Sequence, residues 1–493
     1  AKEFMERYRD VSNFDIYGNT NYIAQFVTEK FPGEIQFDPT IINITTIDIE
    51  VASNEGFPEP EEAKYPVISI AMKNTIDNTF YVWGLGDYDV SKSIMQNNSV
   101  KYEKCRDEHE LLIKFIAHWG TPTHMPDVVT GWNIEFFDVP YLVNRFNKIL
   151  GEDKTKLLSP WKHINQRRAI VNGRELIAYG LLGIESLDYI ELYKWYAPGG
   201  KSQESYRLDN IAQVELGEGK ISYDDYDNLH SLYRLNYQLF IEYNIKDVEL
   251  IIKLEDKLKL LELGVTLAYD TKTNFEDVFA QTRMWDALIY NYLLERNIIV
   301  PPRRVANKTA SFEGAYVKDP QIGLHDWIAS FDMNSLYPHL IMQYNISPET
   351  LIDNHDYTDE MRHLASQASV ENLLQKKLDT SVLKDATITP NGQFFRTDKE
   401  GFLPAMMIDM YDNRKKFKKL MLKEQQAYEN EKDETKKKEI EKLIARYNNL
   451  QLAKKVSLNS AYGAMGSQYF RFYDLRQALA ITQAGQLSIR WIE

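Results

Sequence analysis

Two acidic residues stand two positions apart in a segment that is otherwise apolar and β-branched. Asp48 and Glu50 lie within residues 41–51, IINITTIDIEV, whose composition predicts a strand. Side chains alternate faces along a strand, so both acids project to one side. Carboxylates held together away from water need cations to neutralise them, and oxygen ligands suit Mg²⁺ or Mn²⁺. The pair indicates a divalent-metal site, although a D-x-E pair alone is more often the wet face of an edge strand.

Two later segments carry acids that could join this pair. In GWNIEFFDVPY, Asn133 ends a second expected strand (127–133), and Asp138 precedes a helical run as its expected N-cap. In YNIKD, Tyr243 and Asp247 are four apart and share one face of a helix. Taken singly, Asp138 reads as a cap and Tyr243 as a half-buried packing residue. Together with the D-x-E pair, the pattern is typical of a two-metal nuclease.

These three segments resemble the exonuclease motifs of proofreading DNA polymerases of the B family, in the family's order and at similar separations. The resemblance implies that Tyr243 orients the attacking water and that Asn133 supports the single strand. One metal would lower the pKa of that water, and the other would stabilise the leaving 3′ oxygen. The implied catalytic ligands of the two ions are Asp48, Glu50, Asp138 and Asp247.

A second constellation begins at SFDMNSLYPHLI, where Asp332 follows an expected short strand, 327–331. The segment resembles the first polymerase motif of the B family, D-x-x-S-L-Y-P. The resemblance implies that Asp332 binds two catalytic metals and that the ring of Tyr337 excludes a ribose 2′-OH. His339 stands where the family usually has Ser. The residues whose backbone would contact metal and triphosphate are Met333, Asn334, Ser335 and Leu336.

Further downstream, Lys455, Asn459 and Tyr462 fall at i, i+4 and i+7, which puts them on one helix face before Gly463. They resemble the second motif, K-x-x-x-N-S-x-Y-G. Lys455 would then meet the incoming triphosphate and donate a proton to departing pyrophosphate. Asn459, Tyr462 and Gly463 would line the nascent base pair.

These residues belong to a basic part of an acidic chain. The net charge is -14, yet residues 401–455 hold 14 Lys and Arg against 9 Asp and Glu. Residues 406–428 and 435–457 predict an antiparallel helical hairpin joined by the polar stretch 429–434. Arg414 and Lys418 are four apart on it and resemble the family's phosphate clamp, which would position a triphosphate electrostatically. A solvated basic face is the usual meaning of such charge runs, and we assign that meaning to residues 436–438.

Looser matches extend the resemblance over nearly the whole chain. Residues 313–316, EGAY, are similar to the family's Y-x-G-G/A motif, which implies DNA contacts at Gly314 and Ala315. GFPEP (56–60), NISPET (345–350) and YFRFYDLR (469–476) resemble replicative polymerases of T-even-type bacteriophages.

The expected fold is α/β and multidomain, with a ribonuclease-H-like 3′-5′ exonuclease domain, an α+β palm and helical-hairpin fingers. Strands alternating with helices in the first half support this class, and apolar residues recur at helical spacing over 229–263. A break at Pro301-Pro302, and helical patterns at 275–296 and 366–378, guide the division of the second half. The expected parts are a remnant of an N-terminal domain (1–40), exonuclease (41–259), a helical return to the N-terminal domain (260–303), palm (304–400), fingers (401–467) and a truncated second palm part (468–493).

The resemblance implies a template-directed, proofreading polymerase acting on primer–template DNA and dNTPs, with two Mg²⁺ or Mn²⁺ ions per site. The family's later D-T-D element is not in this sequence. Synthesis would then need a C-terminal polymerase polypeptide, and the family also implies a sliding clamp. A free-standing 3′-5′ exonuclease and a non-catalytic DNA-binding protein are the alternatives. The expected location is the cytoplasm of an infected bacterial host, soluble and without a membrane segment.

Overall fold

The computed structural model describes residues 2–8, 11, 14, 16–53, 56–95, 99–171, 173–197, 203–303 and 314–493. The chain divides into two compact units: residues 36–265, and residues 1–35 together with 266–493. We call them the first unit and the second unit. The first unit has nearly the bounds expected for the exonuclease, 41–259, and the finer division stays a prediction. Residues 304–313, including Glu313 of the EGAY motif, lie outside the described residues.

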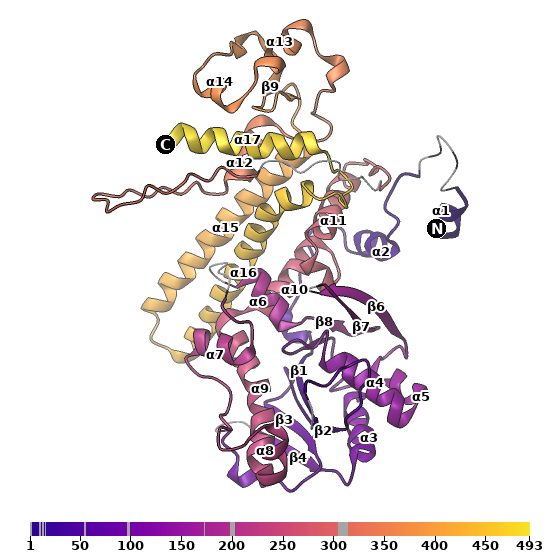
Figure 1. The fold of residues 1–493 in the computed structure, drawn as a ribbon. Coiled ribbons are helices and arrows are strands. Elements are labelled where there is room, and N and C mark those ends of the chain that lie inside the picture. The colour runs from indigo at the N-terminus through magenta and orange to yellow at the C-terminus, as the bar shows by residue number, and fades with distance from the viewer. Residues whose placement is uncertain are drawn as a thin grey trace. The chain divides into compact units, whose positions relative to one another are not determined.

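A six-stranded mixed sheet organises the first unit, in the order β4-β3-β2-β1-β5-β8 (Figure 1). The strand expected at 41–51 is confirmed as β1, although residues 39–41 form a 3-10 turn before it. The strand expected at 127–133 is confirmed but shorter, as β5. The strands of the sheet are β1 (Ile44–Val51), β2 (Val67–Asn74), β3 (Thr79–Gly84), β4 (Ser99–Lys104), β5 (Val128–Thr130) and β8 (Glu185–Ser186).

Helices cover both faces of this sheet. Ile47 and Ile49 of β1 pack with α3 (Glu108–Trp119) and α4 (Asp138–Leu150) in one buried cluster. On the other face, α9 (Tyr237–Leu258) contacts β1, β2 and β3. Because side chains alternate along β1, Asp48 and Glu50 share one face, as the sequence predicted, and this is the face that α9 covers.

The remaining elements of the first unit are short or lie off the main sheet. The helical spacing expected over 229–263 is confirmed, with breaks at Asn236 and at Lys259, which has a left-handed backbone. The elements are α5 (Glu152–Thr155), a two-stranded ribbon of β6 (Ile164–Val171) and β7 (Arg174–Leu181), α6 (Tyr189–Tyr196), α7 (Leu208–Leu216) and α8 (Leu229–Leu235), with 3-10 turns η1 (Pro39–Ile41), η2 (Val90–Lys92) and η3 (Lys156–Leu158). Helix α10 (Leu260–Thr271) crosses the boundary between the units.

The second unit is built around a long helical hairpin, which confirms the prediction for this region. Helices α15 (Phe402–Asn430) and α16 (Glu434–Met465) are joined by a three-residue turn and lie side by side (Figure 1). Asp433 ends the turn and caps α16 by accepting from the amides of Thr435 and Lys436. One buried cluster joins the hairpin to α11 (Gln281–Leu294), α12 (Leu336–Tyr344) and α17 (Leu475–Ile492).

Two helical predictions in this unit are correct only in part. Residues 275–279 form a 3-10 turn, and the helix proper starts at Gln281. The helix expected at 366–378 is wrong in its bounds, because Ser369 caps a new helix there. The other elements are α1 (Lys2–Tyr8), α2 (Tyr22–Lys30), η4 (Phe275–Phe279), η5 (Asn354–Asp356), α13 (Asp359–Gln367), α14 (Val370–Leu374), η6 (Thr380–Val382), β9 (Ala386–Ile388) and β10 (Phe394–Arg396).

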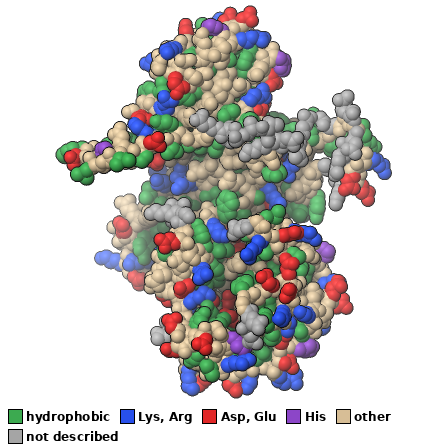
Figure 2. Space-filling model, viewed as in Figure 1, with side chains coloured by type: hydrophobic (Ala, Val, Ile, Leu, Met, Phe, Trp, Pro, Cys, Tyr) green, Lys and Arg blue, Asp and Glu red, His purple; other side chains and the backbone are tan. Residues whose placement is uncertain are grey.

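The strand expected at 327–331 is wrong. No described strand pairs with these residues, and Trp327 has a positive φ of 60°. A strand needs a neighbour for its backbone N–H and C=O groups, and high β-propensity cannot supply one. The apolar side chains here are consequently exposed, with Trp327 at 99% and Phe331 at 83%. Figure 2 shows hydrophobic side chains on the segment that projects at the left of the view. Among the described residues, no helix is both long and apolar enough to cross a membrane.

Candidate active sites

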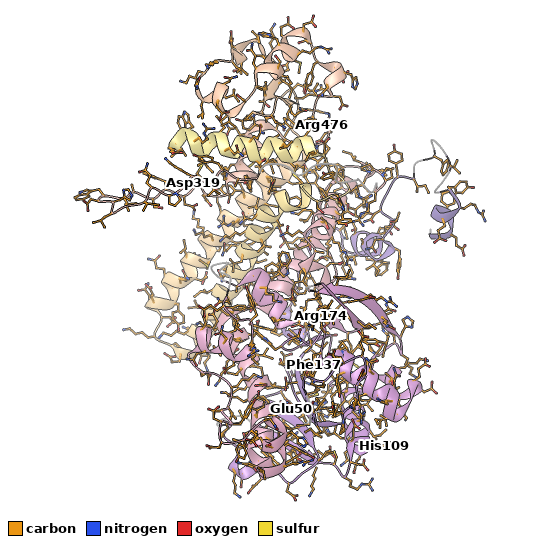
Figure 3. The ribbon with its side chains drawn as sticks, in the orientation of Figure 1. Glu50, His109, Phe137, Arg174, Asp319 and Arg476 are labelled. Carbon is orange, nitrogen blue, oxygen red and sulfur yellow. The ribbon has the colours of Figure 1, made fainter. Side chains whose placement is uncertain are left out.

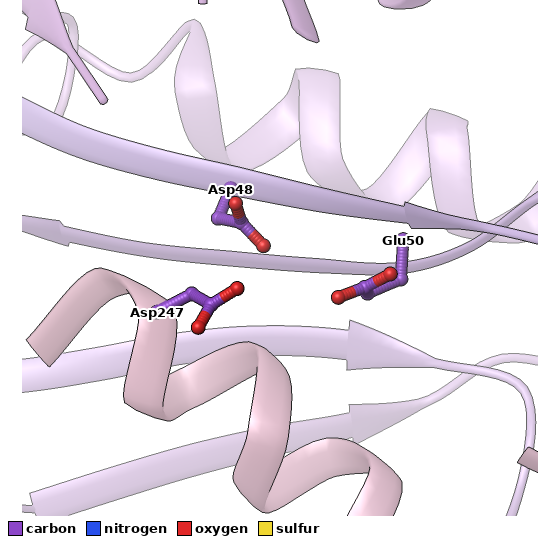
Figure 4. A group of neighbouring side chains, drawn as sticks. All are labelled: Asp48, Glu50 and Asp247. Carbon is purple, nitrogen blue, oxygen red and sulfur yellow. The ribbon is translucent and has the colours of Figure 1, made fainter. Parts of the chain in front are cut away.

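Three of the four predicted exonuclease carboxylates meet in the first unit. Oxygen atoms of Asp48, Glu50 and Asp247 all lie within 4.8 Å of one another. The first two come from β1 and the third from α9, and their carboxylates point into a shared space (Figure 4). Hard oxygen ligands at this spacing suit a divalent cation.

Burial raises the pKa of each of these acids, and neighbouring charges add to the shift or oppose it. Burial, followed by the charges of Asp247 and other carboxylates, raises the pKa of Asp48 well above its usual range. The same causes raise the pKa of Glu50 to about 8. Burial also raises the pKa of Asp247, although a neighbouring ammonium opposes the shift. A group that resists losing its protons in the bare protein gains most from a bound cation.

That ammonium belongs to Lys220, which the sequence reasoning missed. Its Nζ lies 2.5 Å from Oδ2 of Asp247 and donates to the hydroxyl of Tyr243 at 3.1 Å. Lys220 also lies 5.0 Å from the centre of the Tyr243 ring. The predicted water-orienting residue and one predicted ligand are thus held by one cation. A single lysine in the irregular segment between α7 and α8 gave no periodic signal that could have revealed it.

Asp48 is oriented by a second residue that the sequence reasoning passed over. Asn244 is fully buried, and its Nδ2 donates to Oδ2 of Asp48 at 2.7 Å. Its Oδ1 accepts from the Ser69 hydroxyl at 2.7 Å. Asn244 stands inside the YNIKD motif between Tyr243 and Asp247, so its place beside them was available from the sequence.

The fourth carboxylate, Asp138, does not belong to the 4.8 Å group. The prediction that Asp138 caps α4 is wrong, because Phe137 is the N-cap and Asp138 is the first helical residue. Its Oδ1 instead accepts from the backbone amide of Ile49, between Asp48 and Glu50, at 3.1 Å. Burial raises the pKa of Asp138 to about 7. Asp138 is therefore tied to the strand that carries the pair, and its role as a metal ligand stays a prediction.

The loop between β5 and α4 carries the predicted strand-supporting residue. Asn133 has a left-handed backbone with φ 67° and is partly exposed. Phe137 ends this loop and packs against Phe57, with ring centroids 5.0 Å apart. Phe57 is 73% exposed and lies in the GFPEP segment, whose significance as an aromatic surface the sequence reasoning missed. Figure 3 labels Glu50 and Phe137 in the first unit.

The predicted nucleotide-facing residues lie in the second unit, and two aromatics among them are in contact. The rings of Tyr337 on α12 and Tyr462 on α16 have centroids 4.7 Å apart. A β-carbon on Gly485 of α17 would lie 3.1 Å from the Tyr337 ring, so this glycine leaves space for it. A β-carbon on Gly463 would lie 2.4 Å from Oε1 of Gln281.

The start of α12 also meets α15. Nη1 of Arg414 lies 3.5 Å from the hydroxyl of Ser335, a residue with a left-handed backbone of φ 52°. Asn334 donates to the hydroxyl of Tyr411 at 3.4 Å, and the ring of His339 stands edge-on to Tyr411. The first polymerase-like motif and the predicted phosphate clamp are therefore neighbours through Arg414.

The other predicted residues of the second unit are at its surface. Gly314 accepts from Nε2 of Gln486 at 2.9 Å through its carbonyl. Leu336 begins α12 and is half-buried. The exposed residues are Ala315, Asp332, Met333, Lys418, Lys455 and Asn459. Among the described residues, Asp332 does not belong to a cluster of acids like the one that Asp48, Glu50 and Asp247 form.

Comparisons with known proteins agree on the family. A model described as DNA polymerase family B, exonuclease domain, matches residues 10–211, and one described as DNA polymerase family B matches residues 277–492. The DNA-directed DNA polymerase of Escherichia phage RB69 is 32% identical over 563 residues, and that of Enterobacteria phage T4 is 30% identical over 553. Both alignments cover 100% of this chain and 59% of the relative.

Similarity also reaches cellular enzymes. The DNA polymerase delta catalytic subunit of Schizosaccharomyces pombe is 27% identical over 507 residues, with 99% of this chain and 42% of that protein covered. The chain thus spans about three fifths of the length of the phage relatives that it matches. Both units carry a family match, and the acids of β1 and α9 meet in the first. The chain belongs to DNA polymerase family B and includes that family's exonuclease domain.

Proposed function

We propose that the first unit is a ribonuclease-H-like 3′-5′ exonuclease that removes nucleotides from the 3′ end of a single DNA strand. The observation that carries this proposal is the convergence of Asp48, Glu50 and Asp247 within 4.8 Å. Three carboxylates with raised pKa values on a strand and a facing helix suit phosphodiester hydrolysis assisted by two divalent ions.

The donor set fits Mg²⁺ or Mn²⁺, with Asp48, Glu50, Asp247 and, from the start of α4, Asp138 as ligands. Two such ions would supply an activated water and would stabilise the charge on the leaving oxygen. Asn244 holds the carboxylate of Asp48 in place, and Lys220 fixes the hydroxyl of Tyr243. Tyr243 would thereby orient the attacking water, because its hydroxyl accepts from Lys220 and keeps its own proton free to donate.

The unpaired strand would be held by the β5–α4 loop and the surface beside it. Phe57 offers an exposed ring on which a base can stack, and it packs on Phe137, the residue directly before Asp138. Base–aromatic stacking tolerates any sequence, which suits an enzyme that removes whichever nucleotide is mispaired. Asn133 would contribute a polar contact to the same strand.

For the second unit we propose palm and fingers of a template-directed DNA polymerase that binds primer–template DNA and a dNTP. The contact between Tyr337 and Tyr462, and that between Arg414 and Ser335, support a shared nucleotide site. Asp332 would hold the polymerase metals. Lys418, Lys455 and Asn459 would line the triphosphate and base, and Gly314 and Ala315 would contact DNA.

Synthesis would require a further carboxylate, which we propose comes from a C-terminal polymerase polypeptide. A sliding clamp would be a further partner, and the bacterial cytoplasm during phage infection the place of action. The similarity to phage DNA-directed DNA polymerases supports these proposals.

The test is excision of a 3′-mismatched primer and of a single-stranded oligonucleotide by the purified chain in Mg²⁺. We expect removal of single nucleotides, and complete loss in the Asp48→Ala, Glu50→Ala double variant. Normal excision by that variant would refute the assignment. A parallel titration with a dNTP would distinguish a polymerase from a free-standing exonuclease, because only the polymerase needs to bind a dNTP.

A further inference from the structure

One buried carboxylate outside the metal cluster holds the loop that leads from β5 to α4. Asp188 is 2% exposed and lies just before α6. Its Oδ1 accepts from the backbone amide of Asn133 at 2.9 Å, and its Oδ2 accepts from that of Glu135 at 3.0 Å. Oδ1 also caps α6 by accepting from the amide of Ile190 at 3.2 Å. Both oxygens are therefore engaged by backbone N–H groups.

The loop needs such an anchor because its course is tight. A β-carbon on Gly131 would lie 2.3 Å from the Ile134 side chain and 2.6 Å from the carbonyl of Ile47. Ile134 is fully buried, and Asn133 beside it is left-handed. A non-glycine residue in that conformation carries strain, so the surrounding contacts must fix it.

The same loop sets two residues of the proposed exonuclease site. It presents Asn133, and it ends at Phe137, directly before Asp138. Asp138 reaches the amide of Ile49, so the loop fixes the distance between the start of α4 and the acids of β1. The segment around Asp188 is joined to the exit of β5 as well, because the amide of Tyr189 donates to the carbonyl of Gly131 at 2.9 Å.

We propose that Asp188 is a positioning residue for the exonuclease, which acts through the β5–α4 loop to hold Asn133 and Asp138 against the metal-binding acids. The inference rests on the exonuclease proposed above. Loss of its two loop contacts would take this acceptor away from the partly buried amides of Asn133 and Glu135, and the loop would move to satisfy them. Asp138 would then no longer be held at its present distance from β1.

Two substitutions separate this role from helix capping. Asp188→Asn keeps the size of the side chain but presents an NH₂ group to one of the two loop amides. Asp188→Ser keeps a hydroxyl able to cap α6 through Ile190, and is too short to hold both loop amides. The matched control is Glu255→Gln, since Glu255 of the same unit also accepts from two backbone amides, those of Leu261 and Glu262. Glutamine keeps one oxygen, which can still accept from the Tyr189 hydroxyl that Glu255 holds beside Asp188.

The experiment measures single-turnover excision of a single-stranded oligonucleotide by the whole chain over a range of Mg²⁺ concentrations. Both Asp188 variants should excise roughly 10–100-fold more slowly or require that much more Mg²⁺, as is typical when partners of metal ligands are lost. Glu255→Gln should keep the wild-type rate and Mg²⁺ dependence. Circular dichroism and melting curves establish that each variant is folded at the assay temperature.

Wild-type excision and Mg²⁺ dependence in Asp188→Ser would overturn the inference and leave the exonuclease assignment intact. An equal loss in Glu255→Gln would also overturn it, because general destabilisation would then explain the result. If the wild-type chain itself excises nothing, the proposed function fails, and this inference fails with it.

Discussion

Replacing Glu50 with glutamine should stabilise the metal-free protein at pH 8 and weaken the stabilisation that Mg²⁺ gives. Burial, followed by the charge of Asp247, raises the pKa of Glu50 from 4.5 to about 8. Between pH 4.5 and pH 8 the Glu50 carboxyl therefore keeps its proton in the folded protein, whereas the unfolded chain has lost it. The contribution of Glu50 to stability is intact below pH 4.5, and it is lost as the pH rises to 8.

The size of the effect follows from the same shift. Each pKa unit corresponds to about 1.4 kcal/mol, so a change from 4.5 to about 8 sets an upper limit of roughly 5 kcal/mol on the loss. Glutamine has nearly the same shape and cannot ionise, so the variant escapes this loss. A bound divalent cation offsets the same repulsion in the wild type, and Mg²⁺ should raise its melting temperature more than that of the variant.

Thermal unfolding of the wild type and the variant, in EDTA at pH 5 and pH 8 and again with Mg²⁺, measures the melting temperatures that these expectations concern. We expect the variant to melt several degrees above the wild type at pH 8 in EDTA, and the difference to shrink at pH 5. Glu61→Gln is the control, because Glu61 is an exposed carboxylate of the same unit. If Glu50→Gln and the wild type melt together at both pH values, the carboxylates are not desolvated as the structure indicates.

Three further substitutions test neighbouring parts of the two sites. Lys220→Met should slow excision roughly 10–100-fold, because Asp247 and Tyr243 lose the cation that holds them, and single-turnover rates measure this. Phe57→Ala should raise the KM for a single strand and leave kcat unchanged, since a stacked base contributes about 1–3 kcal/mol; an unchanged KM would contradict the stacking role. Lys455→Ala should weaken dNTP binding about 10–150-fold in a fluorescence titration, because a charged hydrogen bond contributes about 1.5–3 kcal/mol. Loss of excision in that last variant would count against separate sites.

Local patterns in the sequence were sufficient where both the pattern and its consequence lie within one element. Alternation along β1 correctly put Asp48 and Glu50 on one face, and the charged helical patterns at 406–428 and 435–457 correctly predicted a helical hairpin. The convergence of Asp247 with that pair depends on α9 packing across β1, over a separation of about two hundred residues. The family resemblance, which encodes such packing, was needed to expect it.

Lys220 and Asp188 could not be found in this way, because each acts on residues far from it in the chain. Lys220 lies in an irregular segment, and its partners are on α9. Asp188 caps α6, and its contacts to Asn133 and Glu135 depend on the pairing of β8 with β5. A cap residue with a second, distant function gives the same local signal as an ordinary cap.

The local sequence around Asp138 also suggested a helix cap, but here the structure shows a different contact instead of the cap. An acid before a helical run is the usual mark of an N-cap, and such a cap would have satisfied the first amides of α4. The structure begins the helix one residue earlier than that reading requires, so the Asp138 carboxylate is released from capping and reaches Ile49. Asp188 holds the loop just before Asp138 through the amides of Asn133 and Glu135. The course of this loop, and not the chemistry of the aspartate, therefore directs Asp138 toward β1.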